Sequence, residues 1–168
     1  MTKDEALQLL VSKLQYNQET GDLIWVKARS HRVGKIAGYV GLNGYRRIGS
    51  KGYLFRAHRL CWFIVYGSMP EHEIDHINGL KDDNRLCNLR QATLSENRTN
   101  VKLRSDNKVG FKGVRRVNRL ARPYRVSIQK NGRRISLGNF ETAEQAHDAY
   151  VKASIKFHGE FANTGKIK

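Results

Sequence analysis

The sequence divides into two parts of very different charge, and this division limits how the chain can fold. Residues 1–100 carry fifteen Lys and Arg against ten Asp and Glu, whereas residues 101–168 carry sixteen against five. The change coincides with residues 101–108, a polar stretch without clear hydrophobic periodicity, which is typical of a linker. At 168 residues the chain can hold two small domains. We therefore predict a domain over residues 1–101, a linker over 102–108 and a second domain over 109–168.

The net charge of +16 and the sequence pI of about 10.2 indicate a polyanionic partner. A membrane is not favoured, because the longest apolar run, residues 60–66, is far too short to cross a bilayer and no basic amphipathic helix is present. The first residues contain no apolar signal segment. Two cysteines without a second pair argue against a zinc ribbon or a disulfide scaffold and fit a reducing cytoplasm. The expected partner is nucleic acid, and the expected location is cytoplasmic.

The first part begins with a helix and continues with strands. Thr2 and Glu5 have the spacing of a capping box, and apolar residues at helical spacing predict a helix over residues 3–14. Strand-like runs follow at 23–26, 35–40, 45–48 and 53–56, with tight turns expected at Asn43-Gly44 and at residues 50–52. An apolar and aromatic run over residues 58–66, closed by Gly67, predicts a buried helix in which Trp62 and Phe63, like Trp25 before them, are core residues.

Candidate chemistry begins with a carboxylate and an imidazole side by side, Asp75 and His76, on a predicted strand. A polar loop and a short strand follow, and a second capping box at residues 93–96 places Asn97 in the first turns of a new helix. If such a hairpin and helix fold back on each other, Asp75 and Asn97 can meet on one cation. Both offer hard oxygen ligands, which suit Mg²⁺ and leave positions for water and phosphate.

The segments 57–60, 75–79 and 83–90, together with Asn97, resemble the HNH nucleases of phage and intron homing endonucleases over roughly residues 20–100. The resemblance implies a ββα-metal core at about residues 57–101, in which Asp75 and Asn97 hold one Mg²⁺ or Mn²⁺ ion. It implies that His76 is the general base and that Asn88 tethers the loop that orients His76. Asp82 and Asp83 are the alternative pair for a second metal, but a turn rich in Asn and Gly favours simple turn residues. If the chain is phage-encoded, its location is the cytoplasm of a bacterial host.

The second part has the pattern of a sheet covered by one helix. Strands are predicted over residues 109–117, 124–130 and 133–138, with a type I′ turn at Asn131-Gly132. A helix capped at Thr142 runs through Phe157 and ends at Gly159, and its stripe of small residues lets it lie close to the sheet. The other sheet face keeps basic and polar side chains, with Arg115 or Arg116 on it depending on a bulge.

Residues 108–163 resemble the DNA-binding domain of plant ethylene-response factors, the APETALA family. The match lies in residues 111–116, 130–132, 137–140, 142–146 and 149–150. It implies a three-stranded antiparallel sheet, packed on one helix, that enters the major groove of double-stranded DNA. Ser136 stands where that family has a base-contacting tryptophan, so the target sequence does not carry over. The sheet plan is also that of phage integrase arm-binding domains. The candidate DNA-binding residues are Lys112, Arg115, Arg116, Arg125, Ser127, Gln129, Arg134 and Ser136.

Together these patterns predict an α+β protein that is a metal-dependent DNA endonuclease, with the second domain finding the site and the first cutting. The alternatives are a non-catalytic DNA-binding regulator on an inactive nuclease fold and a nuclease of phage recombination or packaging. Residues 1–105 alone are expected to keep metal-dependent cutting but to lose most affinity. The target sequence, cleavage of one strand or both, and the choice between monomer and dimer stay open.

Overall fold

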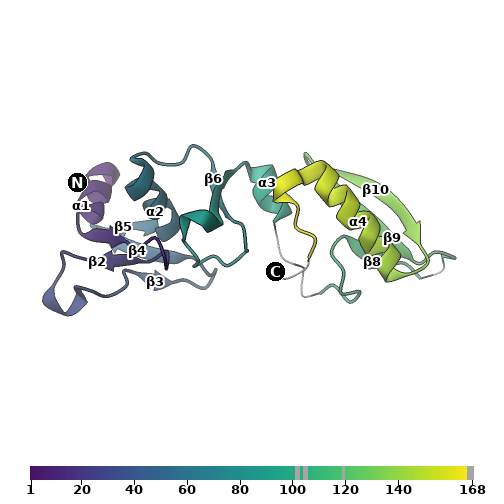
Figure 1. The fold of residues 1–168 in the computed structure, drawn as a ribbon, viewed down its shortest axis with the longest axis horizontal. Coiled ribbons are helices and arrows are strands. Elements are labelled where there is room, and N and C mark those ends of the chain that lie inside the picture. The colour runs from purple at the N-terminus through teal and green to yellow at the C-terminus, as the bar shows by residue number, and fades with distance from the viewer. Residues whose placement is uncertain (101–102, 104–105, 119, 166–168) are drawn as a thin grey trace. The chain divides into compact units, whose positions relative to one another are not determined.

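The structure is a computed structural model that describes residues 1–100, 103, 106–118 and 120–165. The chain forms two compact units, Met1–Gln91 and Ala92–Lys168, which we call the first and the second unit and describe separately. Helices and several small antiparallel sheets occur along the chain, which confirms the mixed α/β class (Figure 1). Among the described residues, no helix combines the length and the apolar character needed to cross a bilayer.

The first unit begins with α1 (Lys3–Val11), and the predicted capping box between Thr2 and Glu5 is present. The helix ends three residues before the predicted limit, because Leu14 already begins β1 (Leu14–Tyr16), which pairs with β2 (Leu23–Trp25). The Ser12 hydroxyl donates to the Leu9 carbonyl oxygen at 3.0 Å and satisfies one of the carbonyl groups at the helix end. The prediction of a helix through residue 14 was therefore wrong at its last turn.

A three-stranded sheet contains β3 (Tyr39–Val40), β4 (Arg46–Ser50) and β5 (Tyr53–Arg56) in that order. The turn from β4 to β5 has Lys51 at φ 50° and Gly52 at φ 84°, as a type I′ turn requires. At Asn43-Gly44 only Gly44 has positive φ, and five residues separate β3 from β4, so the predicted tight turn is a wider loop. The short helical turn η1 (Ser30–Arg32) lies between β2 and β3.

The core of the first unit is built from α1, the strands and α2 (Ala57–Tyr66), and it includes Leu10, Leu23, Ile48 and Leu60. Each such side chain stabilises the fold by about 1.5–3 kcal/mol through removal of apolar surface from water. The helix α2 ends as predicted, with Gly67 in the left-handed conformation at φ 73°. Trp25 and Phe63 are partly buried and pack against this core, as predicted, whereas Trp62 is partly buried and is not among the residues packed against it.

The last part of the first unit is a two-stranded sheet of β6 (Glu73–His76) and β7 (Leu89–Ala92), with the short turn η2 (Leu86–Asn88) just before β7. The residue after β7, Thr93, caps α3 (Leu94–Thr99) through the predicted second capping box with Glu96. Strand, loop, short strand and helix thus follow one another in the predicted order.

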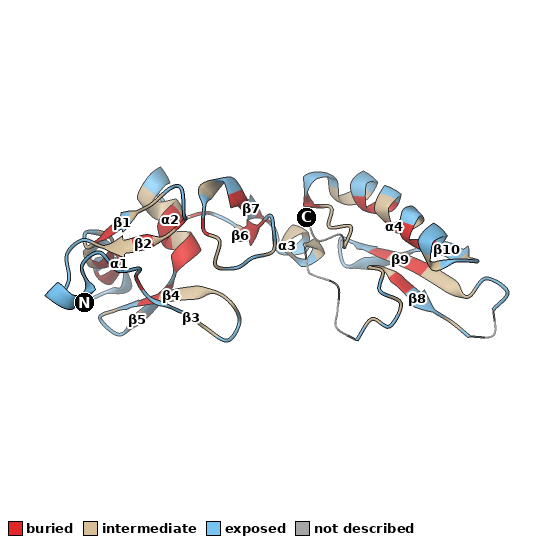
Figure 2. Cartoon of the chain, turned by 60° about the horizontal axis from the view of Figure 1, so that its bottom comes forward, coloured by how far each residue is buried: buried red, intermediate tan, exposed pale blue. Residues whose placement is uncertain are grey.

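The second unit contains a sheet of β8 (Val114–Arg116), β9 (Tyr124–Lys130) and β10 (Arg133–Phe140), in the order β10-β9-β8. Its two longer strands meet at Asn131 (φ 48°) and Gly132 (φ 77°), which confirms the predicted type I′ turn. The helix α4 (Ala143–His158) covers one face of the sheet and is followed by η3 (Gly159–Phe161). Buried residues line up on β9 and on the facing side of α4 (Figure 2). They are Val114, Val126, Ile128, Ala146, Tyr150 and Ala153.

The end of α3 is held by other segments of the second unit. The Thr99 hydroxyl donates to the Phe161 carbonyl oxygen at 3.1 Å, and the Lys112 ammonium donates to the Thr99 carbonyl oxygen at 2.8 Å. The Asn163 side-chain amide donates to the backbone and side-chain oxygens of Asn100 at 3.1 and 2.9 Å. The units consequently divide after Gln91, before the predicted linker. Residues 102, 104 and 105 of that linker, and residue 101 before it, lie outside the described residues, and the division of functions between domains stays a prediction.

Candidate active site and nucleic-acid interface

Asp75 and His76 occupy the end of β6, and each is only 4% exposed. Arg90 on the neighbouring strand β7 donates to the Asp75 atom Oδ2 from Nε at 2.9 Å and from Nη2 at 2.7 Å. Because both groups are charged and poorly exposed, this pair is stronger than a surface ion pair and fixes the carboxylate at the strand end. From the sequence, Arg90 could either touch a phosphate or balance a nearby acid, and in the structure it pairs with Asp75.

Asn84 faces the His76 imidazole, with 3.3 Å between Asn84 Oδ1 and His76 Nε2. The Asn84 amide nitrogen donates to the Asp82 carbonyl oxygen at 3.1 Å, so the amide is oriented with its oxygen toward the ring. In the neutral imidazole the proton therefore lies on Nε2 and the lone pair on Nδ1. Asn84 is 2% exposed and belongs to the polar loop noted in the sequence, but no spacing rule distinguished it from the other asparagines there.

Asn88 ties together the loop that follows His76. Its side-chain oxygen accepts from the Asn78 backbone N–H at 2.9 Å, and its side-chain nitrogen donates to the Asp83 carbonyl oxygen at 2.8 Å. Its own carbonyl oxygen accepts from the Ile77 backbone N–H at 2.9 Å. These bonds connect both ends of the segment 77–83 to one residue, which is the arrangement that a tethering role would need.

Two further rings surround the imidazole. The His58 ring, at the start of α2, lies edge-on to His76 with 5.2 Å between centroids, and the Tyr45 ring lies 5.8 Å from His76 and 5.3 Å from His58. Burial lowers the pKa of His76. Burial, together with repulsion from His76, Arg56 and Arg59, lowers the pKa of His58 to about 3. His58 is consequently neutral at neutral pH.

Asp82 and Asp83 are both committed to hydrogen bonds in the loop. Arg46 donates to the two carboxylate oxygens of Asp82 at 2.9 and 2.8 Å. Arg85 donates to both oxygens of Asp83, and Asn78 adds a third bond at 2.7 Å. The bonds from Arg85 lower the pKa of Asp83 to about 2. This arrangement fits the interpretation of the two aspartates as turn residues, here ion-paired, rather than as a second metal pair.

The residues predicted to hold a cation are Asp75 in the first unit and Asn97 in α3 of the second. One carboxylate and one amide oxygen are hard donors of the kind that Mg²⁺ and Mn²⁺ take. A carboxylate has about four lone-pair positions, so an ion pair with Arg90 is compatible with a cation on the same carboxylate, and the donor chemistry fits. In the described part of the chain, no cluster of three or more His, Cys, Asp or Glu could hold a metal, and the predicted pair is smaller than that.

The outer face of the sheet in the second unit carries six of the eight predicted DNA-binding residues. Because Val114 pairs with Val126 on the buried face, the next pair along the strands faces outward. The outward-facing cross-strand pairs are Arg115 with Arg125, Ser127 with Ser136, and Gln129 with Arg134.

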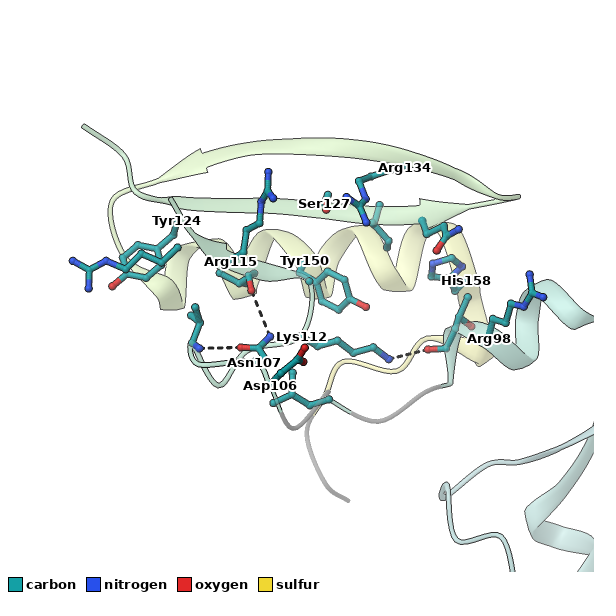
Figure 3. A pocket seen from close by; sticks show the side chains of 18 of the residues that line it. Arg98, Asp106, Asn107, Lys112, Arg115, Tyr124, Ser127, Arg134, Tyr150 and His158 are labelled. Atoms are coloured by element: carbon teal, nitrogen blue, oxygen red, sulfur yellow. Dashed lines mark hydrogen bonds between the residues drawn. The ribbon is translucent and has the colours of Figure 1, made fainter. Parts of the chain in front are cut away.

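The other two predicted residues lie elsewhere. Arg116 pairs with Tyr124 and is exposed on the helix side of the edge strand, so Arg115 rather than Arg116 is on the outer face. Lys112 lies in the loop before β8 and points toward α3, where it holds the Thr99 carbonyl (Figure 3). Burial lowers the pKa of Lys112 to about 8. Its position is that of a residue that holds α3, and the sequence pattern contained no sign of this.

An open groove of about 1310 Å³ lies within the second unit, between α3, the loop before β8 and the edge of the sheet (Figure 3). Six Lys and Arg line it against one acidic residue, Asp106, among the described residues. A concave surface of one sign attracts polyanions and concentrates them near it. The basic residues of this lining are Arg98, Lys108, Lys112, Arg115, Arg116 and Arg134.

Comparison with known proteins adds two findings. Residues 55–99 match the model of an HNH endonuclease family, and this span contains Asp75, His76, Asn84, Asn88 and Asn97. An uncharacterized HNH endonuclease of Acanthamoeba polyphaga mimivirus is 36% identical over 137 residues, which cover 80% of this chain and 70% of the relative. No solved structure matches the chain.

Proposed function

The chain belongs to the HNH endonuclease family, and from this we propose that it is a metal-dependent endonuclease of the homing type that hydrolyses double-stranded DNA. The observation that carries the proposal is the hydrogen-bonded placement of His76. A buried imidazole whose Nε2 hydrogen is directed to Asn84 has its basic lone pair on Nδ1. Such a group can serve as a general base at neutral pH.

In the proposed reaction, Nδ1 of His76 takes a proton from a water molecule. The water oxygen then forms a bond to phosphorus, the bond between phosphorus and the 3′ oxygen breaks, and the 3′ oxygen leaves with the bonding electron pair and takes a proton from solvent water. Asn84 keeps the imidazole in the tautomer that this step needs, and Asn88 holds the following loop closed. The low pKa that burial gives His76 keeps the base unprotonated at neutral pH.

Asp75 and Asn97 are the residues that would hold one Mg²⁺ or Mn²⁺ ion. When bound, such an ion supplies positive charge that offsets the charge developing on the phosphate and on the departing oxygen. Arg90 would hold the Asp75 carboxylate in a fixed orientation.

We further propose that the second unit binds duplex DNA through the outer face of its sheet, in the manner of the ethylene-response-factor domain that it resembles. The cross-strand pairs of arginine, serine and glutamine support this role, since such side chains contact phosphates and base edges. Arg116 and the groove residues would contact the flanking sugar-phosphate backbone.

The proposed activity is tested by incubating the native chain and His76→Ala with supercoiled plasmid and Mg²⁺. The native chain is expected to convert the plasmid to nicked or linear DNA, and EDTA is expected to stop this. Loss of the base is expected to lower the rate by about 10²–10⁴-fold, while DNA binding persists. His31→Ala, which alters an exposed histidine of η1, is the matched control and is expected to cut at the native rate.

Survival of supercoiled plasmid with the native chain across a range of salt and metal conditions would reject the enzyme. Retained DNA binding in that case would favour a non-catalytic regulator. A native rate for His76→Ala would instead reject His76 as the base.

A further inference from the structure

Tyr16 of β1 reaches the loop that carries Asn84. The Tyr16 hydroxyl donates to the Asn84 backbone oxygen at 3.0 Å and accepts from the Leu86 backbone N–H at 3.1 Å. These two groups lie on either side of Arg85, so a single hydroxyl fixes the backbone before and after that residue. Tyr16 lies outside residues 55–99, which the family model matches.

The two groups that Tyr16 holds lead to the two asparagines of the site. Asn84 presents its side-chain oxygen to Nε2 of His76, and Leu86 begins the short turn η2 whose last residue is Asn88. A free N–H at the start of such a turn needs a partner, and the tyrosine oxygen supplies it. The Tyr16 hydroxyl thus positions the backbone of Asn84, which faces the imidazole, and the start of η2, which leads to Asn88.

The turn between β1 and β2 contacts the same backbone from a second direction. Gly21 has φ +79°, and a Cβ atom at this position would overlap the backbone nitrogen of Arg85. Asn17 closes this turn, because its side-chain oxygen accepts from the Glu19 N–H at 2.9 Å. The first hairpin is therefore built against residues 84–86. Burial also raises the pKa of Tyr16 to about 12, so the hydroxyl retains its proton for donation.

We propose that Tyr16 is a positioning residue that, through Asn84, holds the His76 ring in the orientation and tautomer needed for proton abstraction. The inference rests on the proposed role of His76 as the base. It assigns a function in the active site to the first hairpin, whose residues do not themselves contact the reacting groups.

The test is Tyr16→Phe, which keeps the ring and removes only the hydroxyl. The single-turnover rate of plasmid cutting is expected to fall about tenfold, which is the size of loss seen when a residue that orients a site residue from behind is removed. DNA affinity is expected to be unchanged. Tyr53→Phe is the matched control, because the Tyr53 hydroxyl also donates to a backbone oxygen, that of Met1, at 3.4 Å. The control is expected to cut at the native rate. A native rate for Tyr16→Phe would overturn the proposal.

A double-mutant cycle tests the route through Asn84. In an Asn84→Ala background, Tyr16→Phe is expected to lower the rate by less than about twofold, because coupled residues are not additive. A further tenfold loss in that background would overturn the route. All rates are compared at a temperature at which circular dichroism finds each variant folded.

Nitrogen NMR of the histidine rings in the absence of DNA provides a measurement that does not depend on cutting. In the native chain the His76 signals, assigned by their loss in His76→Gln, are expected to report a proton on Nε2. Tyr16→Phe is expected to increase the tautomer with the proton on Nδ1, and Tyr53→Phe is not. An unchanged tautomer in Tyr16→Phe would overturn the inference, whereas failure of the native chain to cut DNA would overturn the proposed function instead.

Discussion

At the scale of single residues, His58 links the stability of the first unit to pH. Its ring is 2% exposed and faces His76 and Tyr45, with Arg56 and Arg59 on the neighbouring backbone, and it has a pKa of about 3 in the folded chain. An unfolded chain has an ordinary histidine pKa near 6.5. Between these values the unfolded chain binds the proton and the folded chain does not. The contribution of His58 to the free energy of unfolding is therefore fully present above pH 6.5 and is lost as the pH falls from 6.5 toward 3.

We predict that His58→Gln reduces this loss. One such histidine contributes at most about 1.4 kcal/mol to the free energy of unfolding per pH unit within the window. Urea unfolding at pH 7, 6, 5 and 4 is expected to give a shallower pH dependence for His58→Gln than for the native chain. His31→Gln is the control and should retain the native slope. Equal slopes for the native chain and His58→Gln would contradict the prediction.

Single residues also mark how far the sequence could predict the site. Asp75, His76 and Asn88 could be placed at one strand end and its loop, since their spacing is local and repeats a family pattern. Asn84 and Tyr16 could not, because their roles depend on a side-chain rotamer and on a contact between residues far apart in the chain. The resemblance implied that Asp75 binds a metal ion but did not identify Arg90, which donates twice to one oxygen of Asp75.

At the scale of elements, the outer sheet face should control the salt dependence of DNA binding. Each phosphate contact releases counterions, so loss of one contact is expected to lower the slope of log affinity against log salt by about 1. We predict this reduction for Arg115→Ala and for Arg134→Ala, measured by fluorescence anisotropy with a labelled duplex. Lys152→Ala, an exposed position on α4, should keep the native slope. An equal reduction for Lys152→Ala would mean that net charge, rather than this face, determines binding.

Elements were predictable where local chemistry decides them. Both capping boxes and the Asn131-Gly132 turn form as expected, because each depends on a few adjacent residues. The loop at Asn43-Gly44 differs because it is also shaped by contacts outside it, with the Lys81 ammonium bonded to the Asn43 carbonyl oxygen at 3.0 Å. The strand expected over residues 109–117 begins only at Val114, since Asn107 closes the preceding residues into a turn.

At the scale of the whole molecule, α3 has six residues and depends on partners in the second unit. Isolated helices shorter than about 12–15 residues are marginal in water. Residues 1–105 contain α3 but lack Lys112, Phe161 and Asn163, which bond to its end. The structure therefore gives a reason to revise the expectation that residues 1–105 cut DNA on their own.

We predict that the truncated chain requires at least about tenfold more Mg²⁺ for half-maximal cutting, as is typical when the support of a metal ligand is removed. Asn163→Ala in the full chain is expected to raise the Mg²⁺ requirement in the same direction without changing DNA affinity. Gln145→Ala, an exposed side chain on α4, is the control. A native Mg²⁺ dependence in both the truncated chain and Asn163→Ala would contradict this prediction and would favour the original expectation that residues 1–105 cut DNA on their own.

The division of the chain after Gln91 has a consequence for protein engineering. A chimeric nuclease could be joined within the predicted linker, residues 102–108. Such a junction would graft a foreign recognition unit onto α3 while discarding the residues that bond to its end. A crossover between Gln91 and Thr93 would instead transfer the helix together with the segments that hold it, so this position is the better joint for exchanging parts among relatives.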